Sequence, residues 1–202
     1  DEQGGSPRTL YSSMPHDGPL IALDRLARTL HLLNALVAGH TLPLFLNVNG
    51  RLLAAVGDDH GRAFRRVVDA LGVSPASIVI ETPVEASAQP DLLTFVLRNY
   101  RANGFRVAVN LDSLAQWQAI SSHAWPDFVK IDSRKLGSGS PAREALEWLT
   151  ALRGDATPIL THVEDASPDY RRLAAGNPFW LQGYAYGRPE AAEVARPTPL
   201  AT

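Results

Sequence analysis

The sequence predicts an α/β fold in which parallel strands are covered by helices, of the kind found in a TIM-like (β/α) barrel. Six short apolar segments alternate with helix-like segments, at intervals of about 20 to 35 residues that suit repeated βα units. The segments are apolar almost throughout, as strands buried on both faces are. With 202 residues, 45% of them hydrophobic, the chain can fill one sizeable core.

The clearest helix covers residues 17–39. Its leucines recur at steps of three and four residues, which is the period of an amphipathic helix; they are Leu23, Leu26, Leu30, Leu33 and Leu36. Asp17 is placed to cap this helix, and Pro19 suits its first turn. The same reasoning predicts further helices over residues 64–72, 91–104, 114–123, 140–154 and 167–177.

The predicted strands end in polar residues. The strands are expected over residues 42–50, 76–83, 105–111, 127–132, 157–164 and 179–187. The polar residues at or near their ends are Asn49, Glu81, Asn110, Lys130, Glu164 and Gln182. An open doubly wound sheet fits the alternation too, but no Gly-rich phosphate-binding turn follows any strand. In a barrel the loops after the strands meet at one face, so we expect these side chains to converge on one site.

Composition excludes several classes of function. The net charge of -2 gives no electrostatic case for binding a nucleic acid polymer. The chain has no cysteine, which excludes disulfides and thiolate metal sites. No apolar run approaches the roughly 20 residues that membrane insertion requires. The first residues lack an initiator Met and a signal-peptide pattern, so we expect a piece of a larger protein.

Six motifs, in order, resemble those of the EAL domain family. The segment FLNVNGRLL resembles the family's SVNLSPRQL, IVIETPVE its LEITE, and GFRVAVNLDSL its GxRIALDDFGTG. DFVKIDSRKL resembles DYLKIDRSFV, PILTHVED resembles VVAEGVET, and LQGYAYGRP resembles QGYLFGRP. The resemblance implies a (β/α) barrel of the EAL type over residues 20–189, between an irregular segment 1–19 and a Pro/Ala-rich tail 190–202. It also implies a bacterial, cytoplasmic domain of cyclic di-GMP signalling.

Active EAL domains hydrolyse cyclic di-GMP with two divalent cations held among carboxylates at the barrel mouth. By resemblance, Asn49 and Glu81 match metal ligands, and Lys130 matches the lysine that orients the nucleophilic water. Gln182 matches the Gln of QGY, and Glu164 the second Glu of AEGVE. These residues would be the remains of a catalytic site.

The departures from the family pattern predict that catalysis is lost. Asn110 and Leu111 stand where DDFGTG has two aspartates, Thr161 replaces the first Glu of AEGVE, and Val84 replaces the second Glu of LEITE. The strand that carries the EAL signature has no counterpart before the first helix, so the barrel should lack its first strand and have an open edge. Since hard cations need several oxygen ligands, we expect no Mg²⁺ or Mn²⁺ site, no metal cofactor and no catalytic residues.

Some of these residues also have purely structural interpretations. Without metals, Lys130 could form an ion pair with Glu81 or Asp132, and Asn49 could bond a loop backbone. Asp112 would replace a lost ligand only if the strand slipped by one residue, which would turn its apolar side chains to the opposite face.

Two functions remain for an inactive EAL domain. As a receptor it would bind cyclic di-GMP at the barrel mouth without hydrolysis, through Arg51, Glu81, Lys130, Gln182 and Arg188. As a regulatory interaction module it would bind a protein partner, or form a homodimer, through the open barrel edge. The alternative is an active, metal-dependent phosphodiesterase whose missing ligands come from another subunit or domain.

Overall fold

A computed structural model describes most of the chain. The described residues are 11, 13, 15–40, 43–55, 59, 61–120, 125–136, 141–152, 156–164, 170 and 179–188. Their centre is a parallel sheet of six strands in chain order. The strands are β1 (Leu44–Asn47), β2 (Ile78–Thr82), β3 (Arg106–Leu111), β4 (Phe128–Asp132), β5 (Thr157–Thr161) and β6 (Trp180–Leu181).

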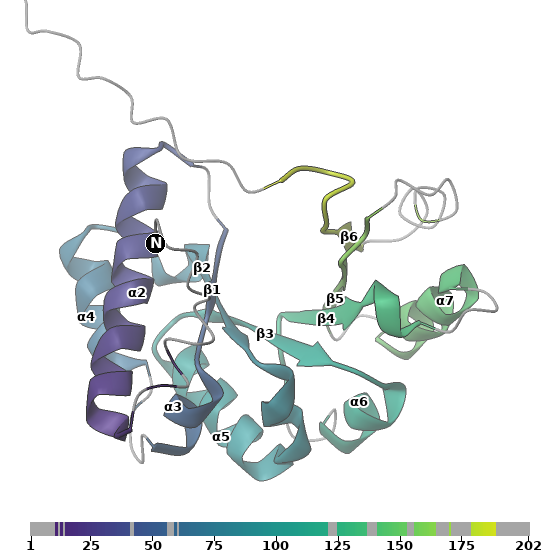
Figure 1. Cartoon of the computed structure of the whole chain (residues 1–202), viewed down its shortest axis with the longest axis horizontal. Helices are drawn as coiled ribbons and strands as arrows, with labels where there is room; N and C mark the ends of the chain where they lie inside the picture. Colours follow the sequence, from purple (N-terminus) through teal and green to yellow (C-terminus); the bar gives the residue numbers. More distant parts are fainter. Residues whose placement is uncertain are drawn as a thin grey trace, which may run out of the picture.

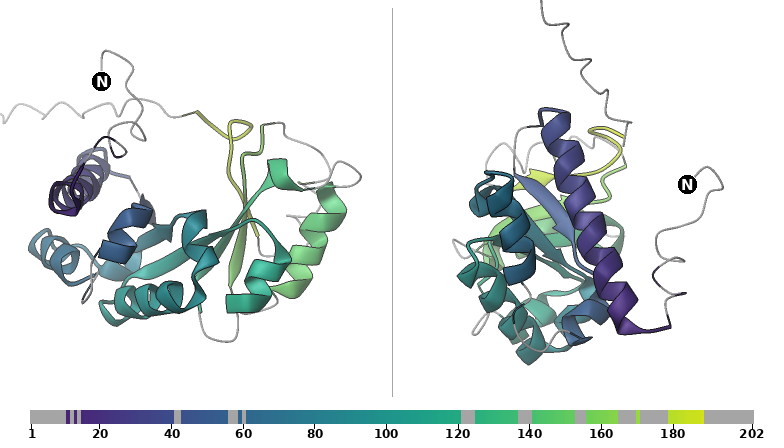
Figure 2. Two further views of the ribbon diagram at one scale, coloured as in Figure 1. Left: turned by 60° about the horizontal axis from the view of Figure 1, so that its bottom comes forward. Right: turned by 90° about the vertical axis from the view of Figure 1, so that its left-hand side faces the viewer.

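The sheet curls, and helices cover its convex side (Figures 1 and 2). They are α2 (Asp17–Val37), α3 (Gly50–Ala55), α4 (Arg62–Ala70), α5 (Pro90–Ala102), α6 (Leu114–Ile120) and α7 (Pro141–Ala151). Short 3₁₀ turns are η1 (Pro75–Ser77), η2 (Val84–Ala88) and η3 (Ser133–Lys135). The arrangement is a partial (β/α) barrel, so the predicted fold class is confirmed. Within the described residues, none of the helices has the length and apolar character needed to cross a bilayer.

The strands are apolar on both faces because each face has its own core. Side chains on the convex face pack against the helices in one large cluster, which includes Leu46, Ile80 and Leu111. Val79, Ala108, Phe128 and Ile159 form a second cluster together with Phe45. These residues alternate along the strands with those of the large cluster, so they line the concave face.

An aromatic group joins the two edge strands across the concave face. The ring centroids of Phe45 in β1 and Trp180 in β6 lie 6.5 Å apart. Phe128 lies 5.2 Å from each of them. In the described residues β1 and β6 form no strand pairing with each other, which agrees with the predicted open edge. The three rings form an apolar floor inside the partial barrel.

The end of β1 differs from the prediction. We expected a strand through Gly50, but β1 ends at Asn47 and Gly50 begins α3. The side-chain Oδ1 of Asn49 accepts a hydrogen bond from the backbone N–H of Arg51 at 3.0 Å. Asparagine competes for backbone partners in this way at turns and helix starts, so it stops the strand.

The last strand is also shorter than predicted, since β6 has two residues and a turn follows it. A Cβ on Gly183 would collide with the backbone of Val163. Gly183 therefore allows the chain after β6 to cross closely over the end of β5. The predicted helix 167–177, apart from Tyr170, and the tail 190–202 lie outside the described residues.

Candidate functional site

Strand alternation produces a polar layer above the aromatic floor. Residues two positions after Trp180 and after each member of the concave-face cluster face the same way. This brings together Asn47, Glu81, Asn110, Lys130, Thr161 and Gln182. The strand register pairs Asn47 with Glu81 and Asn110 with Lys130. These side chains line a pocket of about 610 Å³, whose rim includes Arg134, His162, Glu164 and Tyr184. We call it the mouth pocket.

The centre of the mouth pocket is a buried ion pair. Lys130 Nζ lies 2.6 Å from Glu81 Oε2, and the two side chains are 7% and 11% exposed. Asn110 Nδ2 donates to the other carboxylate oxygen, Oε1, at 3.0 Å and to the carbonyl of Thr82 at 2.7 Å. Lys130 Nζ also lies 5.3 Å from the centroid of the Phe45 ring. Both oxygens of the carboxylate are therefore engaged by donors from the protein.

The rim carries a second group of charges. The guanidinium of Arg134 donates two hydrogen bonds to the carboxylate of Asp132, from Nε to Oδ1 at 3.0 Å and from Nη2 to Oδ2 at 2.7 Å. These bonds lower the pKa of Asp132 below its ordinary value, against the opposing effect of partial burial. His162 Nδ1 lies 3.3 Å from Asp132 Oδ1, and its backbone is left-handed at φ 56°. Such a conformation is uncommon for a residue other than glycine.

The side of the pocket after β6 presents a ring and a guanidinium. Tyr184 lines the pocket and is exposed. The guanidinium of Arg188 lies 5.1 Å from the centroid of that ring. Gln182 is fixed through its backbone, because its N–H donates to Leu160 and its carbonyl accepts from Val163.

The structure brings most of the sequence-predicted site residues together. Glu81, Asn110, Lys130, Glu164 and Gln182 all line the mouth pocket. The structural interpretation of Lys130 as an ion-pair partner of Glu81 is confirmed.

Two predicted residues lie elsewhere. Asn49 lies beyond the end of β1, where its backbone N–H donates to Asp24 Oδ1 at 3.1 Å. Arg51, on α3, forms an ion pair with Asp17 at 2.8 Å. Both line a different cavity, between α2 and η2. They do not line the mouth pocket with the other predicted residues, because the strand ends three residues earlier than predicted.

Asn47, Arg134 and Tyr184 are mouth residues that sequence reasoning missed. A signal for Asn47 was present, since a letter-by-letter alignment of FLNVNGRLL with SVNLSPRQL places Asn47 on the asparagine. Its separation of two residues from Phe45 also puts both side chains on one face. Arg134 lies two residues after the end of β4, within η3, and the conformation of that turn directs it toward the mouth.

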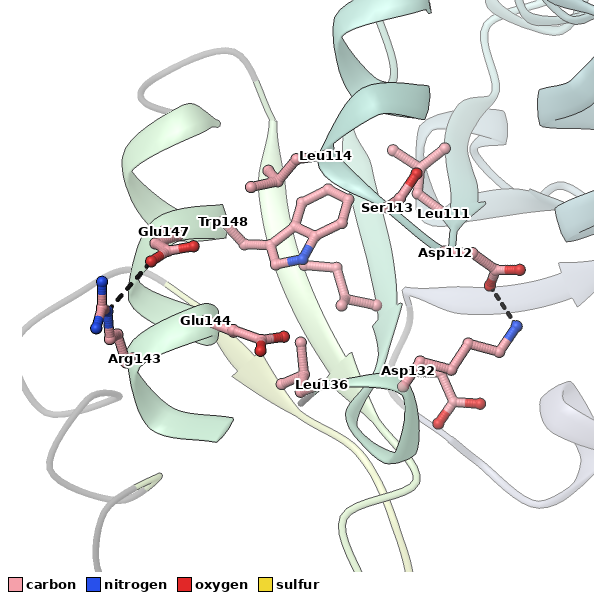
Figure 3. Close-up of a pocket in the computed structure, with 12 residues that line it drawn as sticks. Leu111, Asp112, Ser113, Leu114, Asp132, Leu136, Arg143, Glu144, Glu147 and Trp148 are labelled. Atoms are coloured by element: carbon pink, nitrogen blue, oxygen red, sulfur yellow. Dashed lines mark ion pairs between the residues drawn. The ribbon is translucent and has the colours of Figure 1, made fainter. Parts of the chain in front are cut away.

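The substituted motif after Asn110 faces away from the mouth. Leu111 is buried in the core on the convex face, and Asp112 forms an ion pair with Lys135 at 2.6 Å. Both line a second pocket of about 670 Å³ between β3, β4 and α7, with Trp148 on its wall (Figure 3). The strand therefore keeps the unslipped register, and Asp112 does not replace a ligand at the mouth.

Thr161 stands where the resemblance places the first Glu of AEGVE. The side chain is buried, and its Oγ1 donates to the carbonyl of Ile131 at 3.2 Å. Among the described residues, no three His, Cys, Asp or Glu side chains gather where they could hold a metal ion.

Comparison of the sequence with family models and with curated proteins gave no match. Solved structures do match. A Klebsiella pneumoniae BlrP1 structure, a manganese/cyclic di-GMP complex, superposes with a TM-score of 0.75 over 93% of this chain, at 19% identity. The matching FimX structure is a crystal structure of an EAL domain and gives a TM-score of 0.71 over 95% of this chain and 81% of that one, at 19% identity. This chain has the fold of an EAL domain.

A third EAL structure extends the likeness. Bacillus subtilis YkuI, in complex with substrate cyclic di-GMP and calcium, gives a TM-score of 0.70 over 95% of this chain, at 20% identity. The chain spans about half of the BlrP1 and YkuI chains, 49% in each case.

The donors around Glu81 determine what this carboxylate can offer to a cation. The buried carboxylate of Glu81 already has an ammonium on one oxygen and an amide N–H on the other. Asn110 presents its NH₂ group to that carboxylate, so it acts there as a donor and not as a ligand. A cation pair needs several anionic oxygens to replace its water.

Proposed function

We propose that this chain is a catalytically inactive member of the EAL family that acts in cyclic di-GMP signalling as a receptor. The mouth pocket would bind cyclic di-GMP without metal and without hydrolysis, and occupancy would be passed to a partner or an attached domain. The single observation that supports this most is that Lys130 and Asn110 donate hydrogen bonds to both carboxylate oxygens of Glu81.

The pocket offers the groups that such a ligand requires. Its volume of about 610 Å³ falls in the range of small-molecule sites. A guanidinium binds phosphate through charge-assisted hydrogen bonds. Arg134 lines the pocket, Arg188 lies beside the ring of Tyr184, and both are exposed. The exposed ring of Tyr184 suits stacking on a guanine base. Glu164 and Gln182 offer oxygens to the N–H groups of the base edge.

Calorimetric titration with cyclic di-GMP tests this proposal, run once in chelator and once in excess Mg²⁺. We expect equal affinity in both buffers and no linear dinucleotide after incubation with Mn²⁺. Release of linear product would instead favour the active phosphodiesterase. The absence of binding heat in both buffers would refute the receptor function and leave the interaction module as the remaining function.

Arginine variants localise the binding. Arg188→Ala and Arg134→Ala should each weaken binding about tenfold or more, as expected for a lost charge-assisted hydrogen bond. Arg66→Ala is the matched control, because Arg66 is exposed on α4, away from the mouth. Equal losses in all three variants would contradict binding at the mouth.

A further inference from the structure

Helix α2 exposes a row of apolar residues on its outer side, opposite its buried side. Its inner side is buried and consists of Leu20, Asp24, Arg28, Leu32 and Ala35. Its outer side carries what we call the leucine stripe, Leu26, Leu30, Leu33 and Val37, which are between 36% and 59% exposed. A contiguous row of exposed apolar side chains marks a surface that another molecule commonly covers. Figure 2 shows α2 at the periphery of the molecule.

The buried contacts fix which side of α2 faces inward. Arg28 and Asp24 form an ion pair at 2.7 Å, with both side chains 3% exposed. Arg28 also packs over the ring of Phe64, and Asp24 accepts a bond from the backbone of Asn49. At 3.6 residues per turn, the leucine stripe occupies about 60° of arc directly opposite this face. The helix cannot rotate to bury the stripe without exposing the ion pair.

The spacing of the stripe identifies the partner. Steps of four, three and four residues are the spacing of a helix–helix seam. The order of these steps is the same from either end of the stripe. Two copies of α2 packed antiparallel about a two-fold axis would place Leu26 opposite Val37 of the other copy, and Leu30 opposite Leu33. A two-fold interface requires a surface that complements itself in this way. We propose that the leucine stripe is a homodimer interface, with α2 of a second copy as its occupant.

Charge supports the antiparallel arrangement. None of the four stripe residues is charged, so two copies meet without repulsion along the seam. The last turn of α2 has no basic residue to balance the negative end of the helix dipole. Arg25 is exposed beside Leu26, and the antiparallel arrangement brings it next to that end of the other copy.

The size of the surface sets the strength of the contact. A seam of one helix per copy is smaller than the roughly 800 Å² per partner of a standard interface. The dimer should therefore form at high protein concentration and dissociate on dilution. The proposal does not depend on the mouth pocket, so either can fail without the other.

Cysteine pairing tests the register, because the 202-residue chain has no cysteine of its own. We expect a mixture of Leu26→Cys and Val37→Cys chains to form a mixed disulfide under mild oxidation faster than either variant alone. Leu71→Cys, an exposed position at the end of α4, is the control and should not cross-link. Self-pairing of Leu26→Cys as fast as mixed pairing would overturn the antiparallel seam.

Sedimentation velocity with charged variants gives a second test. In Leu30→Glu/Leu33→Glu, like charges face each other across the axis, and the dimer should be lost. In Leu30→Glu/Leu33→Lys, each Glu faces a Lys of the other copy, and the dimer should persist. Leu71→Glu should behave as the wild type, and circular dichroism checks that each variant folds. A wild-type chain that stays monomeric at every concentration, or two double variants that behave alike, would refute the proposal.

Discussion

Replacing Lys130 by methionine should reveal how much the ion pair at the mouth pocket stabilises the fold. The change keeps the length of the side chain but removes the ammonium 2.6 Å from Glu81. Asn110 still donates to the carboxylate, but no positive charge compensates it. Breaking a buried pair by removing one partner costs about 3 to 5 kcal/mol. Because one hydrogen bond remains, we expect about 3 kcal/mol, a fall of about 6 to 12 °C in Tm for a chain of this size.

Urea denaturation followed by circular dichroism measures this loss, provided the slope of the transition is unchanged. The matched control is Lys135→Met, which removes the same group from an exposed pair with Asp112 and should cost no more than about 1 kcal/mol. The double variant Lys130→Met/Glu81→Leu should recover most of the loss, because apolar residues can replace a buried pair. A loss below about 0.5 kcal/mol in Lys130→Met would refute the pair as the centre of the site.

Three further changes test other parts of the site. Gly183→Ala should destabilise the chain and abolish ligand binding, since the added Cβ meets the backbone of Val163; thermal unfolding and titration check this. Arg134→Met should raise the pKa of Asp132, which Arg134 holds low, as measured by NMR titration. Any stability difference between that variant and the wild type should be present above about pH 4 and vanish as pH falls through the lowered pKa. Asn110→Asp should lower Tm in chelator, and Mn²⁺ should restore part of the loss.

The sheet and most helices were predictable because each strand lies between two apolar layers. That arrangement makes the segments apolar almost throughout, and residues 105–111 and 127–132 therefore give clear signals. The strand ends were harder to place. Asn47 and Asn49 are the same residue type two positions apart. The hydrogen bond that the side-chain oxygen of Asn49 accepts from the backbone N–H of Arg51 decides which one ends the strand.

The chemistry of the mouth was only partly predictable for a related reason. The resemblance identified Glu81, Lys130 and Asn110 from their motifs, but no motif states what these side chains do for one another. That depends on strand register, which pairs Asn110 with Lys130 across β3 and β4. The sequence alone also gave no sign that Arg134 would donate hydrogen bonds to both carboxylate oxygens of Asp132, because these bonds depend on the conformation of η3.

The asparagine at position 110 and the ion pair between Lys130 and Glu81 depend on each other. A carboxylate at position 110 would lie about as close to Glu81 as the amide does, 3.0 Å, and two buried like charges at that distance need cations between them. An asparagine there needs none, because its N–H groups donate to Glu81 and to Thr82. Lys130 then supplies the one positive charge that a single buried carboxylate requires. The charge of the buried Glu81 is in this way balanced by the protein's own side chains, as the proposed metal-independent site requires.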